Sequence, residues 1–387
     1  MILEGELTSS FADKYFNGIE DEENGRESEG KWKKIGRKMM TKSLEVAEKG
    51  CNYNQQVVRI GMLFVAVAVA CLVLSNSVPR TYVLSQVFSR NSGFVGIHRR
   101  NLSLDTILEN AAMQDKTVII TNLNDAWAEP NSIFDLFLKS FEIGNNTQRL
   151  VNHLVVICLD EKAYNRCLTL HPHCYNLVTG NNSTREAFFM TPEYLEIVWR
   201  KIHIMATILE KGYNFVFTDT DIMWLRDPFP RFYPGIDFQS SCDSFFGNAS
   251  DVNNLSNTGF SYVKSNNRTI QFYNFWYDSR RRYPRRHDQH VFDTIKYDPF
   301  TAKIGVQLRF HDTAYFGGFC NPSRDFNVVC TMHANCCVGL QNKIHDLQIL
   351  LEDWRRFMSK DPTMQQNPHW SVPQKCRRGN SRKKNST

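Results

Sequence analysis

The chain has 387 residues, which allows two or three domains at about 150 residues each. Its composition, 42% hydrophobic and 22% charged, is that of a folded protein and excludes wholesale disorder. The net charge of +6 is mild for this length, so no nucleic-acid partner is predicted. The 27 Phe residues predict a large buried core, within one sizeable catalytic or binding domain that has attachments.

Residues 60–79 carry no charge, and their first fifteen residues are almost purely apolar. Twenty residues of helix cover about 30 Å, the thickness of a bilayer core, so this segment predicts a transmembrane helix. The segment follows 59 mostly polar residues, which favours an uncleaved signal-anchor over a cleaved signal peptide. A buried core helix is the alternative. The basic residues before the segment outnumber those after it, which predicts a cytosolic N-terminus and a lumenal C-terminal part.

Two further patterns agree with a lumenal C-terminal part. Nine of the eleven Cys residues follow the predicted anchor, and several are expected to form disulfides in an oxidising compartment. Zinc is the alternative for the cluster between Cys320 and Cys337, although its spacing lacks paired Cys-x-x-Cys knuckles. All eight glycosylation sequons also follow the anchor. They begin at Asn101, Asn145, Asn181, Asn182, Asn248, Asn254, Asn267 and Asn385.

The rest of the chain divides by composition. Residues 1–59 predict a disordered cytosolic tail, residues 80–105 a polar stem, and residues 371–387 a basic polar tail. Between them, residues 106–370 alternate apolar strand-like runs with helical patterns, which is typical of an α/β domain. Residues 118–121, 154–159 and 215–217 predict buried strands. Residues 194–211 predict a helix that ends at Gly212.

Two carboxylates follow the third of these strands. Asp219 and Asp221, one residue apart, are expected at the crevice where open α/β sheets bind ligands. Clustered carboxylates need a cation to offset their repulsion, and a divalent ion that also holds a diphosphate would supply it. A solvated acidic turn is the alternative. The strand before the pair and the apolar residues 222–225 after it favour the metal site.

Five long blocks resemble the nucleotide-diphospho-sugar transferase domain of plant glycosyltransferase family 77. They are GYNFVFTDTDIMWLRDPF (212–229), YVKSNNRTIQFYNFWYDSR (262–280), HDQHVF (287–292), RFHDTAYFGGFC (309–320) and CTMHANCCVGLQNKIHDL (330–347). The resemblance extends over most of residues 106–358. It implies a single GT-A domain with a Rossmann-like mixed sheet behind one type II Golgi anchor. It also implies a UDP-sugar donor, Mn²⁺ (or Mg²⁺), and retaining transfer of arabinose, xylose or galactose to a cell-wall glycan or glycoprotein.

The resemblance also assigns roles near the donor. Asp219 and Asp221 match the Asp-x-Asp motif of the family. Asp221 is expected to be the firmer metal ligand, and Asp219 is expected to contact both the metal and the ribose. His333 resembles the late histidine that completes the metal shell, although a lone histidine is often structural. Lys343 is expected at the diphosphate unless it is a solvated lysine. Lys201 occupies the place of a basic donor contact unless it lies on the helix surface.

Asp288 and Gln289 resemble the acid-amide pair near the β-face of the donor sugar. Retention needs a nucleophile there, or a polar group that stabilises a front-side path. A helix cap is the alternative for Asp288. Asp243 is predicted to contact the acceptor, on family position alone. The five arginines at 280–286 predict either a solvated face or attraction of an acidic glycan.

Two other functions compete with a glycosyltransferase. A metal-dependent phosphohydrolase uses a similar strand followed by Asp-x-Asp, but it needs Gly, Thr or Val after the second Asp, where this chain has Ile222. A non-catalytic lumenal glycan-binding protein would not need Asp219 and Asp221 intact.

Overall fold

The computed structural model describes residues 102–177, 191–360 and 368–376. The predicted cytosolic tail, anchor and nearly all of the stem therefore lie outside the described residues, and so does the C-terminal tail beyond Cys376. Within the described ranges, no helix is both long enough and apolar enough to span a bilayer.

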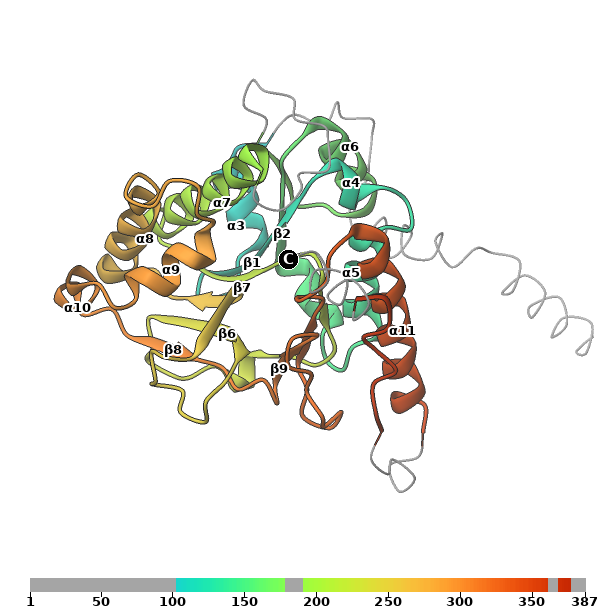
Figure 1. Ribbon diagram of the computed structural model, residues 1–387. Helices are drawn as coiled ribbons and strands as arrows, with labels where there is room; N and C mark the ends of the chain where they lie inside the picture. The colour runs from blue at the N-terminus through green and yellow to red at the C-terminus, as the bar shows by residue number, and fades with distance from the viewer. Residues whose placement is uncertain (1–101, 178–190, 361–367, 377–387) are drawn as a thin grey trace, which may run out of the picture. The chain divides into compact units, whose positions relative to one another are not determined.

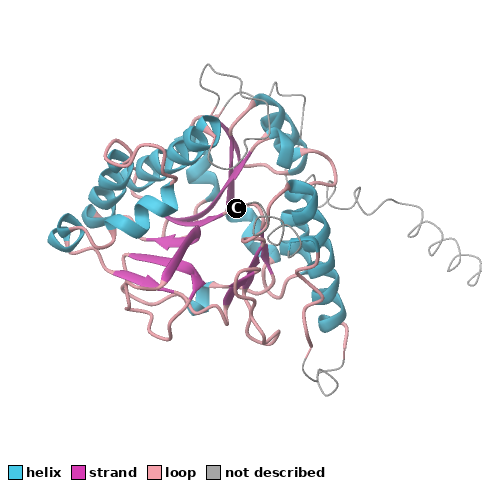
Figure 2. Cartoon of the chain, in the orientation of Figure 1, coloured by secondary structure: helices cyan, strands magenta, loops and turns pink. Residues whose placement is uncertain are grey.

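A mixed seven-stranded sheet forms the centre of the described domain (Figures 1 and 2). The strand order is β3-β2-β1-β4-β7-β6-β8. Strands β1 to β4 run parallel, as do β6 and β8, whereas β7 is antiparallel to both of its neighbours. The strands are β1 (Thr117–Leu123), β2 (Leu154–Cys158), β3 (Cys174–Asn176), β4 (Asn214–Thr218), β6 (Phe238–Ser244), β7 (Leu255–Val263) and β8 (Leu308–Phe310). The mixed α/β class with a largely parallel sheet is confirmed.

The apolar runs in the sequence correspond to the central strands. The runs at 118–121, 154–159 and 215–217 lie in β1, β2 and β4, whose apolar side chains are fully or almost fully buried on both faces. The helical pattern at 194–211 forms α7 (Pro192–Glu210), which begins with a Thr191 side-chain cap and is followed by Gly212 at φ +82°. These four predictions are confirmed.

Helices cover both faces of the sheet and bury two apolar cores. One core joins the sheet to α3 (Leu104–Ala111), α7, α8 (Asn267–Ser279) and α9 (Asp288–Ile295). The other joins the opposite face to α5 (Ile133–Ile143), α6 (Glu161–Leu170) and α11 (Leu340–Met358). The remaining helices are α4 (Asp125–Ala128), α10 (Pro299–Ile304), and the 3-10 helices η1 (Gln148–His153) and η2 (Phe229–Arg231). Because helices pack against both faces of the sheet, the position of the carboxyl end of β4 is fixed.

A second, three-stranded sheet extends from the carboxyl end of β4. It consists of β5 (Ile222–Trp224), β10 (Thr331–His333) and β9 (Phe316–Gly318), in the order β5-β10-β9. β5 begins directly after the Asp-x-Asp turn, and β10 pairs with it antiparallel. A segment more than a hundred residues further along the chain is thereby fixed beside that turn.

Three disulfides are present among the described residues: Cys167–Cys174, Cys320–Cys336 and Cys337–Cys376. Cys158, Cys242 and Cys330 are buried free thiols. The prediction that several cysteines pair is therefore confirmed, and the zinc alternative is wrong because the disulfides occupy the sulfur atoms of Cys320, Cys336 and Cys337.

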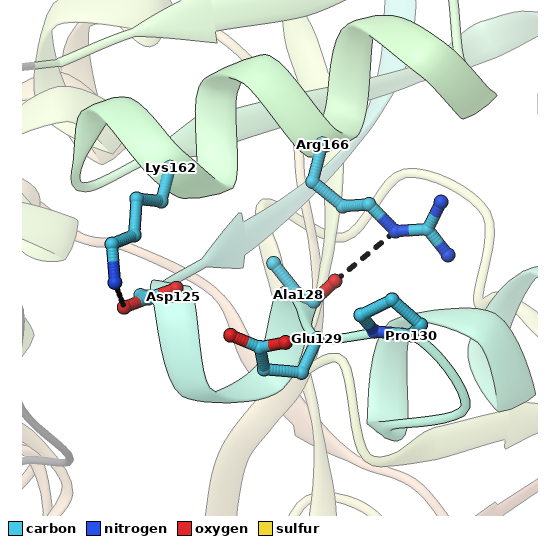
Figure 3. A pocket seen from close by; sticks show the side chains of 6 residues that line it. All are labelled: Asp125, Ala128, Glu129, Pro130, Lys162 and Arg166. Atoms are coloured by element: carbon cyan, nitrogen blue, oxygen red, sulfur yellow. Dashed lines mark hydrogen bonds and ion pairs between the residues drawn. The ribbon is translucent and has the colours of Figure 1, made fainter.

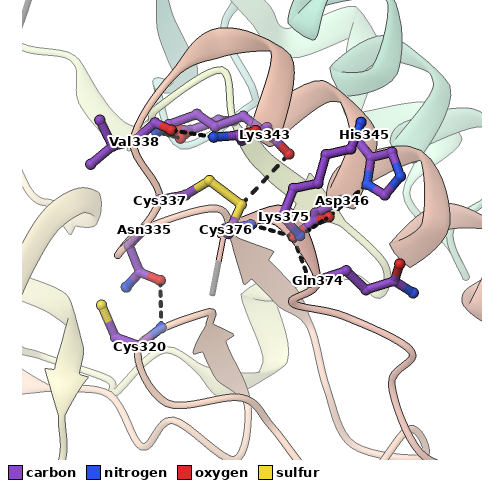
Figure 4. Close-up of a disulfide and its surroundings, with 12 residues drawn as sticks. Cys320, Asn335, Cys337, Val338, Lys343, His345, Asp346, Gln374, Lys375 and Cys376 are labelled. Carbon is purple, nitrogen blue, oxygen red and sulfur yellow. Dashed lines mark hydrogen bonds and ion pairs between the residues drawn. A yellow bond between two sulfur atoms is a disulfide. The ribbon is translucent and has the colours of Figure 1, made fainter. Parts of the chain in front are cut away.

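The domain reaches beyond both of its predicted boundaries. Leu104 in α3 is buried, although it falls in the predicted stem. Residues 371–376 were predicted as tail but are tied to α11: Asp346 accepts hydrogen bonds from three backbone N–H groups of residues 374–376 (Figure 4). Asp353 accepts two more from Ser371. The tail therefore begins after Cys376, whose disulfide closes this segment.

The described sequons differ in accessibility. Asn248 and Asn267 are exposed, and Asn145 is partly exposed, so these predictions are compatible with the fold. Asn254 is fully buried, and its Nδ2 donates to the carbonyls of Asn248 and Asp251. A glycan on Asn254 would replace one of the two donated hydrogens and would need space at a fully buried side chain, so that prediction is wrong for the folded domain. Asn101, Asn181, Asn182 and Asn385 lie outside the described residues.

Candidate active site

The Asp-x-Asp turn continues β4 into β5. Asp219 donates its backbone N–H to the carbonyl of Gly259 at 2.7 Å, and Ile222 donates to the carbonyl of Asp219 at 3.1 Å, which closes the turn. The Thr220 hydroxyl donates to the carbonyl of Asn122 at the end of β1. These bonds fix the turn at the carboxyl ends of two parallel strands, where α/β sheets bind ligands.

The pairing of β5 with β10 brings His333 to this turn. His333 lies opposite Ile222, and Ala334 donates its N–H to the carbonyl of Asp221 at 3.0 Å. The Nε2 atom of His333 lies 3.2 Å from Oδ1 of Asp221. Lys343, in the first turn of α11, places Nζ 2.5 Å from the other carboxylate oxygen of Asp221. The structure thus brings together four of the predicted donor-site residues.

Asp219, Asp221 and His333 fit a divalent metal ion. One ligand atom from each lies within 4.8 Å of the others, and two carboxylates with an imidazole are a donor set that Mn²⁺ accepts. The buried Nδ1 of His333 has no hydrogen-bond partner among the described residues. A Cβ added at Gly259 would lie 2.5 Å from Oδ2 of Asp219, so glycine leaves the space in which this carboxylate lies. We refer to Asp219, Asp221 and His333 as the acidic cluster.

The pKa values of the two aspartates shift in opposite directions because their charged neighbours differ. Burial raises the pKa of Asp221, but the cations Lys343 and His333 outweigh it and hold the pKa well below its usual range. Burial raises the pKa of Asp219, and the nearby Lys201 does not fully offset that effect. Burial lowers the pKa of His333, but Asp221 and Asp219 more than reverse this, so the net pKa is raised. Asp221 is therefore the firmly ionised member, as a metal ligand requires.

Lys201 is buried and forms an ion pair with Asp288. Its side chain is 9% exposed, and Nζ lies 2.6 Å from Oδ2 of Asp288, which is 4% exposed. The alternative of a helix-surface lysine is therefore wrong. Burial raises the pKa of Asp288, but Lys201 and His287 outweigh it and bring the pKa to about 2. The alternative of a polar helix start holds in part: His287 is the N-cap of α9, and Asp288 is its first residue and an acidic group in its first turn.

We expect Lys201→Met to destabilise the fold by about 3–5 kcal/mol at pH 7, because Asp288 would remain as a buried, unpaired carboxylate. In the parent, the lowered pKa means that Asp288 contributes stability above pH ~4, which is lost as pH falls toward 2. Without Lys201, burial raises the pKa above its unfolded value, so the destabilisation relative to the parent should shrink as pH falls from 7 toward 4. Thermal unfolding at several pH values measures this.

The matched control is Lys211→Met, which removes the exposed pair between Lys211 and Asp105. That variant should lie within about 1 kcal/mol of the parent at every pH. Equal effects of the two substitutions, or a Lys201→Met deficit that does not change with pH, would contradict the buried pair.

Gln289 and Asp243 belong to one hydrogen-bond network. Gln289 donates Nε2 to Oδ2 of Asp243 at 3.2 Å, and its Oε1 accepts from the N–H of Thr258 at 3.4 Å. Asp243 Oδ1 accepts from the side-chain amides of Asn257 at 2.7 Å and Asn335 at 2.8 Å. Asp243 therefore contacts Gln289 where the carboxyl end of β6 lies beside the amino end of β7.

The sequence reasoning missed Asn257, Asn335 and Tyr194. Asn335 connects the acidic cluster with Asp243, because it follows His333 by two residues and its Nδ2 donates to Asp243. Its Oδ1 accepts from the N–H of Cys320 at 3.0 Å. Burial raises the pKa of Tyr194, and the charges of Asp288, Asp219 and Asp221 raise it further, so this tyrosine lies near all three carboxylates. The position of Asn335, two residues after His333, was the only available signal.

A polar pocket of about 190 Å³ lies elsewhere, between α4 and α6 (Figure 3). It is lined by Asp125, Ala128, Glu129, Pro130, Lys162 and Arg166. Its cations are already paired, Lys162 with Asp125 at 2.9 Å and Arg166 with Asp135 at 2.9 Å. None of its lining residues bonds a member of the acidic cluster, so it is not part of the site.

A cluster of two carboxylates and a histidine at the carboxyl end of β4 is the arrangement that the sequence resemblance implies. Comparison with known families agrees: the family model described as nucleotide-diphospho-sugar transferase matches residues 149–347, more than half of the chain. The chain belongs to the nucleotide-diphospho-sugar transferase family, and it is a glycosyltransferase.

The similar proteins range from close to distant. The uncharacterized protein At4g15970 of Arabidopsis thaliana is 53% identical over 283 residues, which are 72% of this chain and 75% of that protein. The UDP-galactose:fucoside alpha-3-galactosyltransferase of Dictyostelium discoideum is 38% identical over 76 residues, 18% of this chain and 11% of that enzyme. Among solved structures, mouse xyloside xylosyltransferase 1 is 13% identical, with 57% of this chain and 98% of that one covered, at a TM-score of 0.35.

Proposed function

We propose that this glycosyltransferase transfers a sugar from a UDP-sugar to a glycan or glycoprotein with retention of configuration, in a Mn²⁺-dependent reaction. The observation that carries the proposal is the acidic cluster with Lys343 on one side, and Asp288, Gln289 and Asp243 on the other. In this proposal the groups that bind the diphosphate and the groups that bind the sugar lie on separate elements, which meet near the carboxyl ends of β4 and β6 and the amino end of β7. The resemblance to family 77 supports arabinose, xylose or galactose as the sugar.

Asp219, Asp221 and His333 would hold the metal ion. When bound, the ion supplies positive charge that stabilises the departing diphosphate. Lys343 forms an ion pair with Asp221, so its ammonium group would also be within reach of a diphosphate bound at this cluster. Asp219 would also accept a hydrogen bond from a ribose hydroxyl, which is consistent with its raised pKa.

Asp288 and Gln289 act on the sugar in this proposal. Asp288 is held ionised by Lys201, which suits either a nucleophile or a group that stabilises positive charge on the anomeric carbon. Gln289 is oriented by Asp243 and Thr258, so its amide is fixed before the substrate binds. Preorganised polar groups of this kind favour the transition state over the ground state.

The cellular setting is part of the proposal. We propose a single-pass type II protein of the Golgi membrane with a lumenal catalytic domain. Three features support it: the uncharged segment at 60–79, the larger number of basic residues before it, and the sequons after it. The disulfides support the same setting, because an oxidising lumen allows them to form.

The test is to incubate the purified chain with a panel of UDP-sugars and measure release of UDP with Mn²⁺ and with excess EDTA. We expect one donor to give metal-dependent release that increases when the matching acceptor is present. The structure of the product then reports the anomeric configuration. Release that continues in EDTA, no release from any UDP-sugar, or a product with inverted configuration would contradict the proposal.

A further inference from the structure

A basic turn joins α8 to α9 directly before the predicted catalytic pair. It carries five arginines: Arg280, Arg281, Arg282, Arg285 and Arg286. Its backbone is fixed by hydrogen bonds, among them those from the N–H groups of Arg282 and Tyr283 to Ser279 and from that of Arg286 to Tyr283. The two helices that the turn connects, α8 and α9, both pack against α7, on the side of the domain opposite α11 (Figure 1).

Two of the five arginines have local partners. Arg280 lies over the ring of Tyr277, 3.5 Å from its centroid, and donates to the Tyr277 carbonyl. Arg282 lies 3.2 Å from the carboxylate of Asp298. These contacts indicate that Arg280 and Arg282 stabilise the fold locally.

The other three, Arg281, Arg285 and Arg286, are exposed, and no ion pair is formed by any of them within the described part of the chain. The backbone of Arg285 has a φ of +65°, a conformation that residues other than glycine rarely adopt. Burial lowers the pKa of His290, and the charge of Arg286 lowers it further, so the positive field extends onto α9. Three exposed guanidinium groups on one short turn, with no acidic partner among the described residues, form a local excess of positive charge that attracts anions.

This charge lies close to the predicted reaction centre. Arg286 is two residues before Asp288 and three before Gln289. At roughly 3.3–3.6 Å per residue at most, its Cα lies within about 11 Å of that of Gln289, a distance of two or three sugar rings. An acceptor whose hydroxyl reaches the donor sugar beside Gln289 therefore has neighbouring sugars within range of this turn.

We propose that Arg281, Arg285 and Arg286 bind the carboxylates of an acidic acceptor glycan, one that carries uronate residues. This inference rests on the proposed function, because it assigns the acceptor class of the same site. The planar guanidinium group matches a carboxylate with two parallel hydrogen bonds. Recruitment to acidic lipid headgroups usually takes a cluster of about four to eight basic residues, more than the three available here.

The experiment measures migration of the full-length chain through gels that contain polygalacturonate, or the same polymer with its carboxylates methyl-esterified. We compare the parent with Arg281→Gln/Arg285→Gln/Arg286→Gln. The matched control is Lys116→Gln/Arg324→Gln/Arg355→Gln, which removes three exposed charges elsewhere. We expect the arginine triple to bind polygalacturonate roughly tenfold more weakly than the parent, the scale of three exposed ion pairs. The control should bind as the parent does, and no variant should bind the esterified polymer.

Equal binding by both triple variants, or binding that survives esterification, would overturn the proposal. Tighter retention by vesicles of acidic lipid than by polygalacturonate would also overturn it and assign the turn to a membrane. Because this assay involves no donor, its outcome is separate from the UDP-release test. If UDP release fails while the arginine-dependent retention persists, the proposed function fails and the acidic-glycan site stands without it.

Discussion

Asp221→Asn should reduce turnover by roughly 10² or more while the fold remains intact. The substitution keeps the shape of the side chain but removes the negative charge that Lys343 and His333 hold ionised in the acidic cluster. The expected loss is on the scale of removing one major electrostatic group from a transition state. Steady-state rates of sugar transfer, with circular dichroism as a check on folding, measure it.

The matched control is Asp227→Asn, on the same segment, where the carboxylate pairs with Arg149 outside the cluster. Its turnover should stay within about threefold of the parent, because the partners of this carboxylate are Arg149 and the N–H of Phe229, neither of which belongs to the acidic cluster. Near-normal turnover by Asp221→Asn, or an equal loss in the control, would contradict the metal-binding role.

Gln289→Ala and Asp288→Asn should bind UDP with Mn²⁺ as the parent does and yet transfer sugar at least about 10² times more slowly. Both side chains lie on α9, across the site from the acidic cluster, and act in the proposal only as positive charge develops on the anomeric carbon. A loss in kcat with unchanged donor binding is the signature of an interaction made in the transition state. Rates at saturating donor and titration calorimetry with UDP separate the two quantities.

Asp288→Asn alone leaves Lys201 buried without its anion, so this variant can also lose stability. The double variant Lys201→Met/Asp288→Asn removes both charges, and it should fold while remaining slow. Thr294→Ala, on the exposed side of the same helix, is the control and should turn over normally. If the double variant and Gln289→Ala both bind UDP poorly but reach normal turnover at saturation, the pair is a donor clamp and has no catalytic role.

Three central strands, β1, β2 and β4, could be predicted from the sequence because buried parallel strands appear as uninterrupted apolar runs, whereas β3, β6, β7 and β8 were not predicted. The same reasoning located Asp219 and Asp221, since both follow directly after such a run. Local pattern is sufficient here: the strand and the turn that carries the carboxylates are contiguous in the chain.

The rest of the site depends on contacts between distant segments. His333 reaches Asp221 only through the pairing of β5 with β10, and strands of three residues leave no periodic signal. Lys201 occupies a helical position that pattern alone assigns to the surface; its burial depends on Asp288, which lies on another helix. Asn254 has a complete sequon, but only the tertiary structure shows that its amide is buried and hydrogen-bonded.

The most direct measurement is a titration of UDP into the full-length chain, with Mn²⁺ and with EDTA, for the parent and for Asp221→Asn. If Asp219, Asp221 and His333 hold a metal that also binds the diphosphate, the affinity of the parent for UDP should fall at least about tenfold in EDTA. Asp221→Asn should bind UDP weakly under both conditions. Equal UDP affinity in Mn²⁺ and EDTA, with no effect of the substitution, would show that this cluster is not the metal-dependent donor site.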